Sequence, residues 1–210
     1  MQRGEQVIAT DISLQRDRLN LILSAEQQEA IEFAALDITE TQQVAQMIGD
    51  KGVTHIIHLA ALQVPFCKAK PVLGAQVNVV GTINVFEAAR QHNIGHVVYA
   101  SSVAVYGPPE RYPADTPIEN DAPLDPHTLY GVYKQANEQA ARVYHADYGL
   151  SSTALRPYIV YGVGRDQGLT SDPTKAMLAA IRGEPYHIGV RRAGPDAVCC
   201  GCGAPVYPGC

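Results

Sequence analysis

The sequence lacks several features that would mark particular classes of protein. Its 210 residues carry a formal net charge of −5, and the lysines and arginines are scattered, so no basic stripe is available for nucleic acid. The N-terminus has no apolar stretch like that of a signal peptide, and we expect no apolar run as long as a membrane span. These absences predict no nucleic-acid partner, no membrane association and a cytoplasmic location.

Cysteine is scarce until the end of the chain. Of the five cysteines, only Cys67 precedes residue 199, and the others crowd the final stretch: Cys199, Cys200, Cys202 and Cys210. Such a cluster can bind zinc, or form a disulfide knot in a secreted protein. The third alternative is a shifted reading frame. We favour it because possible codons for this tail, read one nucleotide out of register, can encode a peptide that resembles a strand and the start of a helix. We therefore predict that 190–210 is an atypical, frameshifted tail.

Apolar runs and helical patterns alternate along the rest of the chain. The runs predict strands at 5–11, 31–37, 54–61, 96–102 and 152–162, and the patterns predict helices at 39–50, 71–92, 127–149 and about 172–182. This order predicts an α/β fold with a Rossmann-like, doubly wound parallel sheet and right-handed crossovers. The Pro- and Asp-rich segment 107–128 is expected to be a long loop over the C-terminal edge of the sheet, where sites of α/β proteins form.

Tyr130 and Lys134 are the strongest candidates for chemistry. Four residues apart in LYGVYK, they share one face of the predicted helix, and a cation beside a phenol favours the phenolate. That pairing would let Tyr130 exchange a proton with an alcohol, although a stacked surface pair is the alternative. Ser102 ends a buried strand, where its hydroxyl can bind the same substrate oxygen, whereas Ser101 is expected to bond to the turn.

Several motifs, taken in order, resemble the NAD-dependent epimerase/dehydratase family of the extended short-chain dehydrogenase/reductase superfamily, which includes UDP-glucose 4-epimerase. They are a strand-end Asp11, ALDI, HLAA, VNVVGTINV, YASSVAVYG, LYGVYK and LRPYIVYG. The resemblance runs from about residue 5 to 188. It implies NAD as the cofactor, with Ser102, Tyr130 and Lys134 as the catalytic trio, in which Tyr130 is the general acid/base and Lys134 also holds the nicotinamide ribose.

The resemblance also implies a cofactor-binding set beyond the trio. Asp11 would hold the adenosine ribose, which favours NAD over NADP because a carboxylate repels a 2′-phosphate. The remaining members would flank the adenine, line the cofactor or adjoin the nicotinamide: Asp37, Ile38, Leu59, Ala60, Ala61, Asn78 and Tyr158. Buried packing is the alternative for HLAA, and a satisfied core amide is the alternative for Asn78. His55 and His58 are not expected to bind a metal, since residues three apart on a strand face opposite sides.

The sequence departs from the family pattern at both ends and at one internal position. No strand with a GxxGxxG turn precedes Asp11, so we expect a partial NAD-binding Rossmann domain at 1–189, truncated at both ends, with upstream DNA that encodes the missing unit. The first strand of this fold lies between those predicted at 5–11 and 54–61, and its loss leaves their backbone groups unpaired. Ile159 stands where sugar-nucleotide epimerases carry asparagine, which favours a smaller substrate.

The predicted function is hydride transfer on a sugar or nucleotide sugar by an epimerase/dehydratase-type oxidoreductase or isomerase. Two alternatives remain open: a dehydrogenase of a free sugar or sugar acid, and an inactive fragment that keeps only a dimerisation surface. By resemblance, that surface is a homodimer interface formed by helices 71–92 and 127–149.

Overall fold

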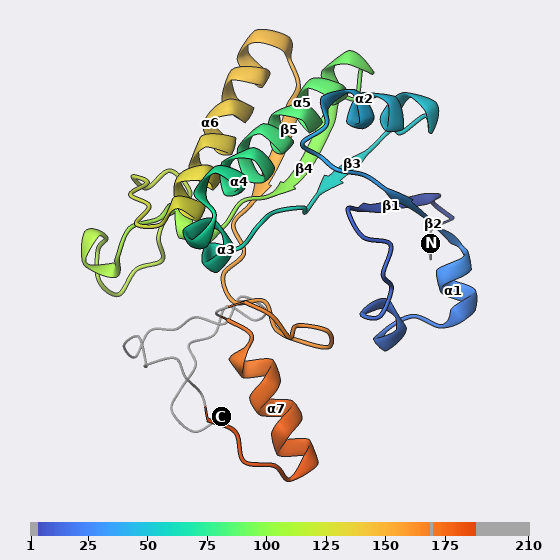
Figure 1. The fold of residues 1–210 in the computed structure, drawn as a ribbon. Helices are drawn as coiled ribbons and strands as arrows, with labels where there is room; N and C mark the ends of the chain where they lie inside the picture. Colours follow the sequence, from blue (N-terminus) through green and yellow to red (C-terminus); the bar gives the residue numbers. More distant parts are fainter. Residues whose placement is uncertain (1–3, 169, 188–210) are drawn as a thin grey trace. The chain divides into compact units, whose positions relative to one another are not determined.

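The computed structural model describes residues 4–168 and 170–187 (Figure 1). Among these residues the chain forms two compact units. One unit spans 38–158, and the other combines the segments before residue 38 and after residue 158. The predicted site residues are divided between these two units.

The 38–158 unit, here called the central unit, is built on three parallel strands. These are β3 (Ile56–His58), β4 (His96–Ala100) and β5 (Ser151–Leu155), and their order is β3-β4-β5. The register pairs Ile57 with Val98 and Val98 with Thr153. A parallel arrangement of this kind requires crossover connections between the strands, and helices supply them.

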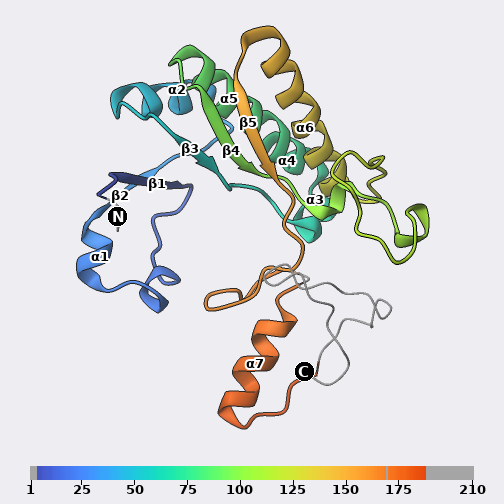
Figure 2. The ribbon, with the colours of Figure 1, turned by 180° about the vertical axis from the view of Figure 1, so that it is seen from behind.

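Five helical segments of the central unit pack over one face of this sheet (Figures 1 and 2). They are α2 (Thr41–Asp50), α3 (Val64–Ala69), α4 (Pro71–Ala75), α5 (Gly81–Gln91) and α6 (Leu129–Tyr148). A π-helical turn, Gln76–Val80, joins α4 to α5. Proline at the first position of α4 is compatible with a helix start, because its missing N–H has no helical partner there.

The core of the central unit lies between this sheet and these helices. Phe86 on α5 and Tyr99 on β4 are fully or almost fully buried and meet edge to face, with ring centroids 5.4 Å apart. Aromatic pairs in this geometry contribute about 0.5–1.5 kcal/mol beyond their buried area. The opposite face of the sheet is open within this unit, since Ile57 and Leu155 remain 71% and 53% exposed.

The second unit contains a two-stranded parallel sheet. Strands β1 (Val7–Asp11) and β2 (Ile31–Ala35) pair from Val7 with Ile31 to Asp11 with Ala35. Between them, α1 (Ala25–Glu29) begins with a capping box at Ser24, whose hydroxyl accepts from the Gln27 N–H. Helix α7 (Asp172–Arg182) ends on Gly183, which has a φ of +69° that glycine adopts readily.

The predicted α/β fold with parallel strands and intervening helices is confirmed, but all five strands are shorter than predicted. The strand expected at 54–61 is reduced to β3, whose only partner among the described residues is β4. In the part of the chain that the structure describes, the other edge of β3 has no strand beside it to form hydrogen bonds that would extend the strand through 59–61. This agrees with the expected loss of a neighbouring strand. The strand expected at 152–162 ends at Leu155, since Pro157 cannot donate to a ladder.

One expectation about apolar runs is wrong. The continuous helical stretch Pro71–Gln91 is 21 residues long and apolar enough to cross a membrane by length and composition. Half of its most apolar window is buried within the structure, and a core helix meets the same criterion. The prediction missed this stretch because polar residues such as Asn78 and Thr82 interrupt the apolar run, although the helix as a whole is apolar and carries few charges.

Candidate active site

Tyr130 and Lys134 lie together at the start of α6. The Lys134 ammonium is 5.7 Å from the centre of the Tyr130 ring and donates to the Ala100 carbonyl at 2.6 Å. Ala100 is the last residue of β4, so this bond joins the lysine to the strand that carries the serines. Lys134 is only 3% exposed, and burial lowers its pKa to about 8. The pair is therefore built into the unit rather than stacked on its surface.

The two serines bind groups within the chain that differ from those expected. The Ser101 hydroxyl is buried and donates to Glu138 Oε1 at 2.5 Å, so the prediction that Ser101 bonds to the turn is wrong. It is Ser102 that caps the turn, where its Oγ accepts from the Ala104 N–H at 3.1 Å. Because that bond uses a lone pair of Oγ, the Ser102 O–H remains able to donate to a ligand.

Gly131 allows the Ser102 turn to approach the start of α6. A Cβ at Gly131 would lie 2.2 Å from the Ala104 carbonyl oxygen and 2.9 Å from Pro126 Cβ. The residue next to Tyr130 therefore has to be glycine for the turn at 102–105 to pack where it does. This close approach is what places Ser102 and Tyr130 in the same part of the unit.

We expect Gly131→Ala to lower the free energy of unfolding by about 1–3 kcal/mol, since backbone must move to accept the methyl group. Urea denaturation measures this effect. Gly95→Ala is the matched control, because a Cβ at Gly95 has nothing within 4 Å. Equal stability of the two variants would contradict the close approach.

Asn78 fixes the segment that follows β3. Its Oδ1 accepts from the Leu62 N–H at 2.7 Å, and its Nδ2 donates to the Leu62 carbonyl at 2.8 Å. Asn78 is fully buried and lies in the π-helical turn, a feature often found at functional sites. Asn78 is therefore a satisfied core amide that fixes Leu62, next to the Leu59, Ala60 and Ala61 segment, and its cofactor role stays a prediction.

His58, in the HLAA motif, is buried at the end of β3. Thr82 Oγ1 donates to the Asn78 carbonyl, so it accepts from His58 Nε2 at 3.1 Å. Burial, together with the nearby Lys134 charge, lowers the His58 pKa to about 4. His55 is exposed, as expected for a residue on the other side, and among the described residues no group of three or more His, Cys, Asp or Glu side chains is placed to hold a metal. The cysteine cluster lies outside the described residues.

The neutral His58 makes stability depend on pH. Its folded pKa, about 4, is below the ordinary value of 6.5, so its contribution is complete above pH 6.5 and is lost as the pH falls towards 4. Between pH 7 and 4.5 we expect this group to remove about 2 kcal/mol of stability. Urea denaturation at both pH values should show a smaller loss for His58→Gln, and an equal loss would contradict the assignment.

A buried ion pair that the sequence reasoning missed lies beside the serines. Arg156 binds Glu138 with two hydrogen bonds, Nε to Oε1 at 2.8 Å and Nη2 to Oε2 at 2.6 Å. The Arg156 Nη1 donates to the Tyr106 hydroxyl and to the Asn120 carbonyl. Burial raises the pKa of Glu138, but the hydrogen bonds from Arg156 and Ser101 outweigh it and leave that pKa below its usual value. The YxxxKxxxE spacing on one helix face was the available signal.

The other predicted cofactor residues are divided between the units. Asp11 is exposed at the end of β1, where its Oδ1 accepts from the Ser13 N–H at 2.9 Å, and Asp37 follows β2 in the same unit. Ile38 opens the central unit, and its carbonyl accepts from Asn84 Nδ2. Tyr158, 40% exposed, closes that unit. The trio, Ile38, the HLAA segment, Asn78 and Tyr158 thus belong to the central unit, whereas Asp11 and Asp37 belong to the other unit.

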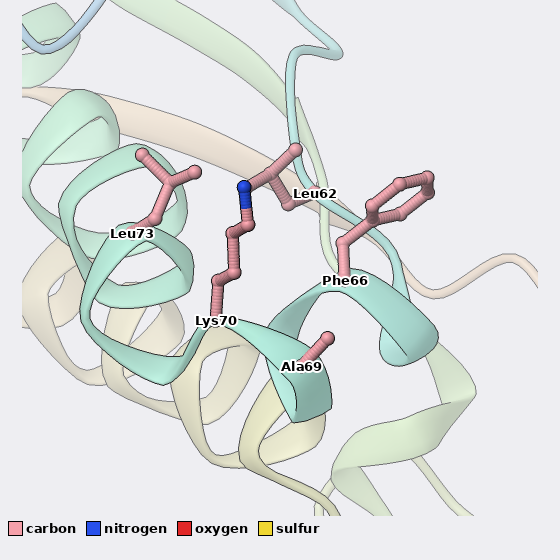
Figure 3. Close-up of a pocket in the computed structure, with 5 residues that line it drawn as sticks. All are labelled: Leu62, Phe66, Ala69, Lys70 and Leu73. Carbon is pink, nitrogen blue, oxygen red and sulfur yellow. The ribbon is translucent and has the colours of Figure 1, made fainter.

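A shallow pocket of about 210 Å³ opens near the junction of α3 and α4 (Figure 3). Its walls are mainly apolar, and the Lys70 side chain extends across it with its nitrogen towards Leu62. The lining residues are Leu62, Phe66, Ala69, Lys70 and Leu73. None of the predicted site residues lines it, although Asn78 holds the backbone of Leu62 in its wall.

Comparison with known proteins shows the family of the chain. The family model described as the NAD dependent epimerase/dehydratase family matches residues 1–193. The chain belongs to the NAD-dependent epimerase/dehydratase family. It is 32% identical to a UDP-glucose 4-epimerase of Mycolicibacterium smegmatis, over 84% of this chain and 56% of that protein. The motifs quoted from the sequence therefore identified the family correctly.

Solved structures of this family share the fold. An L-threonine dehydrogenase from Cupriavidus necator matches 88% of this chain and 57% of its own, with a TM-score of 0.74 and 27% identity. A Thermus thermophilus UDP-glucose 4-epimerase in complex with NAD matches 88% and 58%, with a TM-score of 0.68 and 27% identity. Both are Rossmann-fold enzymes, and the chain spans about half the length of the curated relatives it matches.

Proposed function

We propose that this chain acts as an oxidoreductase or isomerase of the epimerase/dehydratase type on a sugar or nucleotide sugar, with Ser102, Tyr130 and Lys134 as its catalytic residues. The observation that carries the proposal is the buried Lys134 ammonium, which lies beside the Tyr130 ring and is bound to the end of the serine strand. A buried cation is costly unless it is paired and hydrogen-bonded, and a buried cation next to a phenol suits proton transfer.

Each member of the trio has a distinct task in this proposal. The Ser102 O–H donates to the oxygen of the substrate carbinol, and Tyr130 takes the proton from that oxygen or returns it. The Lys134 charge favours the phenolate, and its remaining N–H groups suit the hydroxyls of a ribose. When bound, NAD supplies the hydride acceptor and donor.

The residues of the chain suit the two ends of NAD better than the pyrophosphate between them. Lys134 offers donors to the nicotinamide ribose, and the small side chains of Ala60 and Ala61 permit close approach of the backbone. Asp11 and Asp37 supply carboxylates for the adenosine end, and Ile38 lies next to Asp37. No glycine-rich turn in the sequence offers backbone amides to the pyrophosphate. We propose 1–189 as a partial NAD-binding Rossmann domain on these grounds.

The substrate separates the two enzymatic alternatives. Similarity to UDP-glucose 4-epimerases supports a nucleotide sugar, whereas Ile159 and the similarity to an L-threonine dehydrogenase support a dehydrogenase that releases NADH. We would incubate the chain with millimolar NAD and either UDP-glucose or galacturonate. Interconversion of UDP-sugars without net absorbance at 340 nm supports the epimerase, and net NADH formation supports the dehydrogenase. If the chain is folded but shows neither activity, the inactive-fragment alternative is favoured.

A homodimer in the cytoplasm is the proposed assembly and location. Helices α4 and α6 and the π-helical turn leave large apolar side chains exposed, between 41% and 73%: Val72, Leu73, Val80, Leu129, Val132 and Val143. Apolar stripes on neighbouring helices suit a helix-on-helix interface with a second copy. Sedimentation of the chain and of Val143→Glu would test the dimer, since a buried charge should shift the species to a monomer.

A further inference from the structure

Ser102 lies between two anchors that lead to the same buried ion pair. On one side, the adjacent Ser101 hydroxyl donates to Glu138. On the other side, the Val103 N–H donates to the carbonyl of Pro157 at 3.2 Å, and Pro157 directly follows Arg156. Glu138 and Arg156 hold each other through two hydrogen bonds, so one neighbour of Ser102 is bound to this pair directly and the other is bound to the backbone next to Arg156.

The pair is well suited to hold this position rigidly. The side chains of Arg156 and Glu138 are only 15% and 5% exposed, and a planar guanidinium matches a carboxylate with two parallel bonds. Together with Ser101, the pair joins three elements: Glu138 lies on α6, Arg156 follows β5 and Ser101 follows β4. A buried ion pair by itself contributes little to stability, so its position here needs another explanation.

We propose that Glu138 and Arg156 are positioning residues that orient Ser102 for the proposed reaction. Ser101 transmits the constraint through the backbone on the N-terminal side of Ser102, and Pro157 transmits it on the C-terminal side. The inference rests on the proposed function only for the role of Ser102. Its structural content, that the pair fixes the Ser102 side chain, holds with or without a substrate.

The Ala104 amide reports the orientation of Ser102, because the two share a hydrogen bond. We would measure hydrogen exchange of this amide by NMR, relative to the Val98 amide in the centre of β4, so that a global loss of stability cancels in the ratio. Ser102→Ala sets the scale by removing the acceptor. Ser101→Ala should accelerate Ala104 exchange at least about fivefold over Val98, and Ser101→Thr, which keeps the hydroxyl, should stay within about twofold of the unaltered chain.

Two further variants separate positioning from general packing. Ser171→Ala is the matched control, since Ser171 is equally buried and its hydroxyl binds only the Gly168 carbonyl among the described residues. It should leave the Ala104 ratio unchanged. Glu138→Asp keeps the charge that Arg156 needs but retracts the carboxylate from Ser101, so it should reproduce the Ser101→Ala result. An unchanged Ala104 ratio in Ser101→Ala and Glu138→Asp, with Ser102→Ala accelerated, would overturn the proposal. No substrate or cofactor is used, so this outcome is independent of the proposed function.

Discussion

Replacement of Lys134 by methionine is expected to make the chain more stable at pH 7 while it removes the proposed chemistry. The buried ammonium has a pKa of about 8, below its ordinary 10.5, so burial of the charged form is unfavourable in the folded chain. At pH 7 the lysine is charged in both the folded and the unfolded chain, and the whole penalty is present. Methionine removes the penalty but loses the bond to Ala100, and we expect a net gain of about 1–3 kcal/mol in the free energy of unfolding.

Burial of Lys134 should also make stability depend on pH. Because the folded pKa is the lower one, the unfolded chain binds more protons between pH 8 and 10.5, and stability should rise with pH over that range. Urea denaturation at pH 7 and pH 9.5 should show this rise in the unaltered chain and not in Lys134→Met. Lys70→Met, at an exposed lysine, is the control and should stay within about 0.5 kcal/mol. A less stable Lys134→Met variant would contradict the assigned cost.

A polypeptide made of these 210 residues is expected to bind NAD at least about 100-fold more weakly than the same residues joined to a strand, GxxGxxG turn and helix placed ahead of residue 5. The turn would contribute backbone amides at a helix N-terminus to the pyrophosphate. Two hydrogen bonds to a charged group, at about 1.5 kcal/mol or more each, account for a factor of this size. Isothermal titration calorimetry of both proteins measures the ratio.

The added strand also has a structural effect that the NAD experiment must separate from phosphate binding. It offers a partner to the open edge of β3, where the expected strand 54–61 is reduced to three residues. A fusion in which valine replaces the three glycines keeps the strand and loses the turn, and it should bind NAD as weakly as the 210 residues alone. Micromolar binding by those 210 residues would refute the prediction.

The order of elements and the family could be predicted from the sequence, because they depend on local patterns. Alternating apolar runs and helical periodicity gave β1 to β5 and the long helices α2, α5 and α6, and the Tyr130–Lys134 spacing placed both side chains on one helix face. Short segments such as α1 and α3 were missed. They contain five and six residues, too few for a helical pattern to stand out.

The contacts that orient the site could not be predicted, because they join residues far apart in the chain. Ser101 and Ser102 are adjacent and chemically identical, and only the carboxylate of Glu138, 37 residues further on, decides which of them is held inside. Likewise, the sequence does not indicate that the Ala104 carbonyl, 27 positions earlier, lies where a side chain at Gly131 would be. Distant packing of this kind is fixed by the fold and not by local propensity.

The central claim is that the central unit carries a working Ser-Tyr-Lys site, and a chimaera tests it most directly. Residues 38–158 would replace the matching segment of the Mycolicibacterium smegmatis UDP-glucose 4-epimerase, which supplies the rest of the enzyme. The measurement is the ratio of turnover between Tyr133→Phe and Tyr130→Phe in this chimaera. Tyr133 lies three residues after Tyr130 on α6, and its hydroxyl donates to the Pro71 carbonyl. Loss of the Tyr133 hydroxyl therefore tests packing alone. We predict a ratio of about 100 or more, the contribution typical of a general acid/base. A ratio near one, with both variants folded and NAD bound, would contradict the account.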